Sequence, residues 1–125
     1  MALLAALGGC ALGARAEAVY LQQHKASGAL AETILAVETD QPALAEELYG
    51  LEDELGAACA PLREAGHRRW FGQEVDGDLE WAVVRALDTC EAKAREVERL
   101  VRWASPEAAG YSLAGPEHPA AGADE

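Results

Sequence analysis

Two stretches of the sequence decide the fold: residues 44–62, LAEELYGLEDELGAACAPL, and residues 79–101, LEWAVVRALDTCEAKAREVERLV. In both, apolar residues recur every three or four positions, which places them on one face of an α-helix. The sequence therefore predicts two amphipathic helices. Their apolar stripes are Leu44, Leu48, Leu51, Leu55, Cys59 and Leu62, and Leu79, Val83, Leu87, Cys90, Ala94, Val97 and Val101.

The two stripes match in a single antiparallel register. When Cys59 is set opposite Cys90 in an antiparallel hairpin, apolar residues of the two stripes also lie opposite one another, because the two residue numbers of each pair have the same sum. This register predicts a helical hairpin joined by a Cys59–Cys90 disulfide. The alternative is that both cysteines stay reduced and are buried as small hydrophobic residues. The other pairs are Leu62 with Leu87, Leu55 with Ala94, and Leu48 with Val101.

The composition favours an all-α fold. Half of the 125 residues are hydrophobic, but only 6% are aromatic, and alanine and leucine dominate. A β-sheet would require more β-branched and aromatic residues. A chain of this length forms one domain with a small core.

The rest of the chain completes a three-helix bundle with up-down-up topology. Apolar spacing predicts a first helix over 15–37, where Tyr20, Leu21 and Leu35 widen the stripe and Gly28 allows close helix packing. A second helix over 42–65 ends at Gly66, and Pro61 kinks or breaks it near Cys59. A third helix over 79–104 begins with Asp78 as its N-cap. We expect a helical bundle over 15–105 and a disordered tail over 106–125, which is rich in proline, glycine and acids.

The charge of the chain argues against a nucleic-acid partner. The sequence has 10 lysine and arginine residues against 22 acidic residues, giving a formal net charge of -12. Binding to phosphates requires clustered positive charge, which this composition lacks. An acidic surface serves solubility, or it faces a basic partner.

Residues Leu7-Gly8-Gly9-Cys10, which follow a short apolar run, resemble the lipobox of bacterial lipoproteins. The resemblance implies that Cys10 is diacylated, that residues 1–14 form a signal and lipid-anchor segment, and that the protein faces the periplasm from a bacterial membrane. Export to an oxidising compartment agrees with a Cys59–Cys90 disulfide. Two alternatives remain: residues 1–16 simply begin the first helix, or a secretory cleavage follows Ala16.

One segment between the second and third helices is a candidate for partner binding. His67, Arg68, Arg69, Trp70 and Phe71 combine guanidinium groups with aromatic rings in a predicted loop. Such a combination can anchor an acidic or glycan-like partner. Alternatively, the aromatic rings cap the end of the bundle and the arginines neutralise a helix terminus. We expect Trp81 and Trp103 to pack against the first helix.

No catalytic, cofactor or metal motif is recognisable. The three histidines, His24, His67 and His118, are not at the spacing of metal ligands. Neither Cys59 nor Cys90 belongs to a C-x(2-4)-C pair. The sequence also lacks nucleophile and phosphate-loop motifs. We expect no enzyme activity, no metal and no cofactor. The first hypothesis is a non-catalytic envelope lipoprotein that binds an unknown protein or cell-wall partner. The alternative is a cytoplasmic protein-interaction or regulatory module with reduced cysteines.

Overall fold

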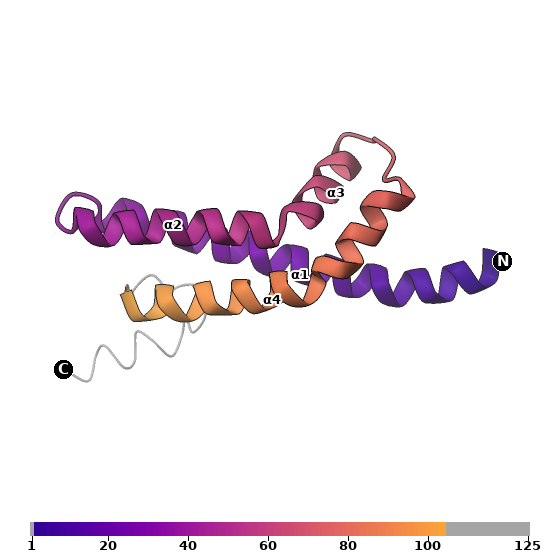
Figure 1. The fold of residues 1–125 in the computed structure, drawn as a ribbon, viewed down its shortest axis with the longest axis horizontal. Coiled ribbons are helices and arrows are strands. Elements are labelled where there is room, and N and C mark those ends of the chain that lie inside the picture. The colour runs from indigo at the N-terminus through magenta and orange to yellow at the C-terminus, as the bar shows by residue number, and fades with distance from the viewer. Residues whose placement is uncertain (1, 105–125) are drawn as a thin grey trace, which may run out of the picture.

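The computed structural model describes the backbone of residues 2–104 and the side chains of residues 13–104. The described chain is all-α, as predicted, and has four helices: α1 (Ala2–Val37), α2 (Pro42–Ala58), α3 (Ala60–Trp70) and α4 (Gly77–Ala104). Figure 1 shows that α1, α2 and α4 alternate in direction, which gives the up-down-up arrangement. The predicted tail over 106–125 lies outside the described residues.

The number of helices differs from the prediction because the second helix is divided at Cys59. Helix α2 ends at Ala58 and α3 begins at Ala60, so a three-helix count is wrong. Pro61 occupies the first turn of α3, where its missing N–H leaves no hydrogen bond unmade. The proline therefore marks a break, and α3 leaves the direction of α2 at this point (Figure 1).

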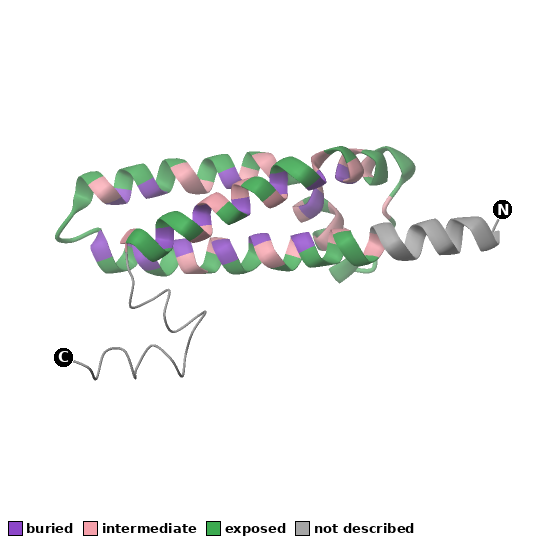
Figure 2. Cartoon of the chain, turned by 90° about the horizontal axis from the view of Figure 1, so that it is seen from below, coloured by how far each residue is buried: buried purple, intermediate pink, exposed green. Residues whose placement is uncertain are grey.

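The core follows the predicted apolar stripes. Helix α1 contributes Val19, Ala26, Leu30, Ile34 and Val37. Leu21 and Leu35 are exposed, so they do not widen the α1 stripe as expected. Figure 2 shows buried positions recurring along the long helices. Helices α2, α3 and α4 bury Ala45, Leu48, Leu55, Leu62, Val83, Leu87, Ala94, Val97 and Val101 against α1 and one another.

The cysteine register also agrees with the structure. The sulfur atoms of Cys59 and Cys90 lie at disulfide distance, and their Cα atoms are 4.7 Å apart. Both cysteines are fully buried, and each member of the three apolar pairs that the register predicted is buried. The cross-link therefore joins the break between α2 and α3 to the middle of α4.

The helix starts differ in detail from the sequence expectation. Helix α4 begins two residues earlier than predicted, and its cap is Asp76, not Asp78: the Leu79 N–H donates to Asp76 Oδ1 at 2.9 Å. Gly66 lies inside α3 and does not end a helix. Helix α1 passes the expected boundary near residue 14 without a break. The side chain of Cys10 lies outside the described part of the chain, so its acylation stays a prediction.

None of the described helices combines the length and the apolar character that crossing a membrane requires.

Candidate functional site

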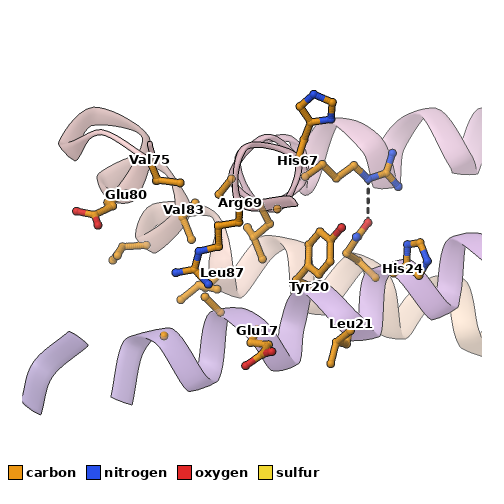
Figure 3. Close-up of a pocket in the computed structure, with 18 of the residues that line it drawn as sticks. Glu17, Tyr20, Leu21, His24, His67, Arg69, Val75, Glu80, Val83 and Leu87 are labelled. Atoms are coloured by element: carbon orange, nitrogen blue, oxygen red, sulfur yellow. Dashed lines mark hydrogen bonds between the residues drawn. The ribbon is translucent and has the colours of Figure 1, made fainter. Parts of the chain in front are cut away.

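A wide groove opens between α1 and the segment formed by α3 and the start of α4 (Figure 3). Its volume is about 1200 Å³, and apolar side chains form most of its surface. In Figure 1, α3 and the first turns of α4 slant away from α1. The apolar lining includes Tyr20, Leu21, Trp70, Val75, Trp81 and Val84.

A close contact between Tyr20 and Gly66 fixes the distance between α1 and α3 beside the groove. A Cβ atom added at Gly66 would lie 2.6 Å from Cε1 of Tyr20, so a larger residue there would displace the Tyr20 ring. The close approach that we expected at Gly28 is absent, because no atom lies within 4 Å of a Cβ built at that position. At Gly66, in contrast, the Tyr20 ring packs directly on the backbone of α3.

A partly buried polar cluster connects α2 and α3 to α1 near the helix break. Gln23 is only 2% exposed and accepts a hydrogen bond of 2.8 Å from Nε of Arg63. Nη2 of Arg63 lies 3.6 Å from a carboxylate oxygen of Glu52, and the Ser27 hydroxyl donates to the same carboxylate. Sequence reasoning missed this cluster, although Gln23 was visible as a polar interruption in an apolar stripe. A buried polar residue of this kind requires a partner.

The predicted binding residues divide into two pairs. The structure places His67 to Trp70 in the last turns of α3 and not in a loop. Arg69 and Trp70 line the groove, whereas Arg68 and Phe71 do not. Trp70 is 84% exposed, so it does not cap the end of the bundle. Phe71 packs its ring on His67, with 4.7 Å between the ring centroids.

The guanidinium group of Arg68 is held by two carboxylates and is not free to bind a partner. It donates to Glu64 at 2.8 Å and to Asp76 at 3.2 Å, so it links the end of α3 to the start of α4. These bonds, first the one to Glu64, raise the pKa of Arg68. The pKa of the Asp76 carboxyl is lowered, mainly by the Leu79 N–H and then by Arg68. Arg68 therefore orders the connection beside the groove.

Two tryptophans of α4 have surroundings that the sequence did not predict. Trp81 is 61% exposed and lines the groove, and Trp103 is 85% exposed near the opposite end of α4. The expectation that both rings pack against the first helix is therefore wrong. Trp70 and Trp81 together provide two solvent-exposed indole rings at one groove.

Charged groups from three helices also line the groove. Glu17 lies on α1, Arg69 on α3 and Glu80 on α4 (Figure 3). Within the described side chains, residues 13–104, these three groups form no hydrogen bond or ion pair with one another or with other residues. They are therefore available to a molecule in the groove.

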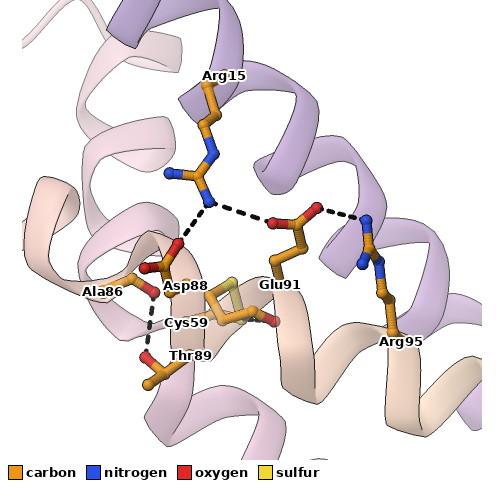
Figure 4. Close-up of polar contacts among 8 residues, drawn as sticks. Arg15, Cys59, Ala86, Asp88, Thr89, Glu91 and Arg95 are labelled. Carbon is orange, nitrogen blue, oxygen red and sulfur yellow. Dashed lines mark hydrogen bonds and ion pairs between the residues drawn. A yellow bond between two sulfur atoms is a disulfide. The ribbon is translucent and has the colours of Figure 1, made fainter.

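An ionic contact holds the start of the described α1 side chains on α4. Arg15 donates to Asp88 at 2.6 Å and to Glu91 at 3.2 Å, and Glu91 also accepts from Arg95 at 2.8 Å (Figure 4). The bond to Asp88, followed by that to Glu91, raises the pKa of Arg15. This contact ties α1 to the middle of α4.

The arrangement is suited to binding. A broad apolar surface with a few charged groups is typical of ligand and partner sites. Among the residues that the structure describes, no three His, Cys, Asp or Glu side chains are grouped so that they could hold a metal ion. Comparison of the chain with protein-family models, with curated proteins and with solved structures found no match.

Proposed function

We propose that this protein is a non-catalytic binding or structural component of the bacterial cell envelope, held at the periplasmic face of a membrane by lipid on Cys10. The observation that carries the proposal is the Cys59–Cys90 pair, which lies at disulfide distance in the core. Disulfides persist in the periplasm and are rare in the cytosol. The cross-link is therefore in keeping with export, which the lipobox-like residues 7–10 also imply.

The position of the groove supports a binding role near a membrane. The described part of its lining includes Gly13, which lies three residues after Cys10 on the same helix. Three helical residues correspond to about 4.5 Å along the axis. A lipid on Cys10 would thus hold the groove close to the bilayer surface. Several acyl chains anchor a protein firmly, whereas one chain anchors it weakly.

Intact mass of the protein tests this proposal. The native gene with its upstream region is expressed in a bacterial host, and the protein is recovered separately from membrane and soluble fractions. We expect the membrane form to begin at Cys10 with added acyl groups, and we expect two cysteines to be alkylated only after reduction. The Cys10→Ser variant is the matched control, and it should lose the acyl mass and leave the membrane fraction.

The opposite result is equally clear. A soluble chain that begins at Met1 and is alkylated without reduction would overturn the proposal. It would favour the alternative, a cytoplasmic interaction or regulatory module with reduced cysteines. An acylated chain whose Cys59 and Cys90 react without reduction would keep the anchor and remove the disulfide from the account.

A further inference from the structure

We propose that the groove binds a basic amphipathic helix of a partner protein. The inference deepens the proposed binding function and rests on it for its biological setting. Its structural basis is independent, because it uses only the described side chains around the groove.

The shape of the groove favours a helix. Its walls are formed by α1, α3 and the start of α4, and the described part of the α1 wall runs from Gly13 to Ser27. These 14 helical steps correspond to about 21 Å. The volume of about 1200 Å³ exceeds the 300–1,000 Å³ that is typical of small-molecule pockets. A helix of about four turns would extend along this wall and complete the helical packing that α3 leaves unfinished.

The apolar lining matches the apolar face of such a helix. Leu21 on α1, Trp70 on α3 and Trp81 on α4 are more than half exposed, although all three line the same groove. Helix-in-groove recognition uses apolar anchors at i, i+3, i+4 and i+7, and aromatic residues commonly supply most of the binding energy. The exposed rings are therefore placed where a second helix would cover them.

The charged groups that have no partner favour a basic occupant. Arg63 also lines the groove, but Gln23 and Glu52 hold its guanidinium group, which leaves two acids and one arginine without a partner in the described chain. Glu17 and Glu80 lie on opposite walls, and neither has a hydrogen-bond or ion-pair partner among residues 13–104. The chain as a whole has a formal net charge of -12, which attracts a cationic partner and repels an anionic one. Arg69 adds one positive charge on α3. An occupant with lysines toward Glu17 and Glu80 and one acid toward Arg69 would bind in a single orientation.

Tryptophan fluorescence of the full-length oxidised protein provides the test. Trp103→Phe removes the indole at the far end, so the signal comes from Trp70 and Trp81. The probes are two synthetic amphipathic peptides of about 14 residues with the same leucine face, one with lysine and one with glutamate at its polar positions. We expect a blue shift with the lysine peptide and at least about tenfold weaker binding of the glutamate peptide.

Matched variants separate groove binding from general attraction to an acidic surface. Trp81→Ala and Leu21→Gln should each weaken the lysine peptide about tenfold, and their helical circular dichroism should stay unchanged. Glu17→Lys/Glu80→Lys should weaken it more than Glu46→Lys/Glu47→Lys, which changes the net charge equally on exposed positions of α2. These results together would support the proposal.

Several outcomes would overturn it. One is equal binding of both peptides, and another is lysine-peptide binding that ignores Trp81→Ala and Leu21→Gln. A blue shift with phosphatidylcholine vesicles but not with peptide would assign the groove to a lipid surface. A dimer in sedimentation that Leu21→Gln dissociates would assign it to a second copy. A failure to bind peptide leaves the acylation and disulfide results unaffected, so the two proposals fail separately.

Discussion

The two ends of this bundle differ in how completely its helices cover one another. At the end away from the groove, α1, α2 and α4 bury a continuous row that includes Leu30, Leu55 and Val97. At the other end, α3 turns away after Cys59, and Trp70 and Trp81 remain exposed on the groove. The comparison shows that a closed three-helix core gives way to an open groove where the second helix breaks.

The Cys59–Cys90 cross-link lies between these two ends, and its removal should have the largest effect. It closes a loop with a sequence separation of 31 residues. Loop-closure entropy for such a loop corresponds to about 3 to 4 kcal/mol of stability. We expect Cys59→Ala/Cys90→Ala to unfold at much lower urea concentration than the oxidised protein. An identical midpoint for the two proteins, with and without reductant, would contradict this expectation.

Truncation of a core side chain at the closed end should have the next largest effect. Leu55 of α2 is fully buried in the core. Leu55→Ala should therefore lower the free energy of unfolding by about 3 kcal/mol, because transfer energy is lost and a cavity is left. The control is Leu35→Ala, because Leu35 is 71% exposed and should change stability by less than about 0.5 kcal/mol. Urea unfolding compares the two. Equal losses would show that the closed end is not packed as described.

The contact between Tyr20 and Gly66 offers a smaller test at the open end. Gly66→Ala places a methyl group against the Tyr20 ring and should cost about 1 to 3 kcal/mol. Gly50→Ala is the matched control, because a Cβ atom there meets nothing within 4 Å. It should stabilise α2 by about 0.5 to 1 kcal/mol, through its higher helix propensity. Stabilisation by both variants in thermal unfolding would remove the close contact.

The cap of α4 should give the smallest effect, and one that depends on pH. The folded protein lowers the pKa of Asp76 below its ordinary value of 3.8, through the Leu79 N–H and then Arg68. The stabilisation is therefore present above about pH 4 and is lost as the pH falls through the folded pKa. Asp76→Ala should lower the urea midpoint at pH 7, and the difference from wild type should shrink toward pH 2. Asp78→Ala is the control, since Asp78 does not cap the helix; a constant difference for Asp76→Ala would contradict the assignment.

Periodicity predicted much of the fold because the spacing of apolar residues along a helix determines which of its faces is buried. The stripes that contain Leu55 and Ala94 are buried in the predicted register, and Cys59 lies at disulfide distance from Cys90. Pro61 was recognised as a position of kink or break. The consequence of that break was not predictable, because the direction that α3 takes depends on contacts such as Tyr20 with Gly66 and Gln23 with Arg63.

The candidate site was predicted only in part. Sequence composition identified the segment from Arg68 to Phe71, but it could not distinguish the arginine that binds Glu64 and Asp76 from the one that lines the groove. Neighbouring side chains on a helix point in different directions, so their roles depend on what lies opposite. The contributions of Leu21, Trp81 and Glu80 were missed because the groove joins residues that are far apart in the chain.

The sequence by itself determined that this protein is helical and acidic, and that one register aligns its two cysteines with its leucines. These properties follow from spacing and composition, which act along the chain. Only the tertiary structure decided that the second helix divides, that its second part turns away from α1, and that two tryptophans and two unpartnered glutamates of the described chain meet at one groove. The physical reason is that a groove is a property of the distance between helices, which packing sets and no single helix encodes.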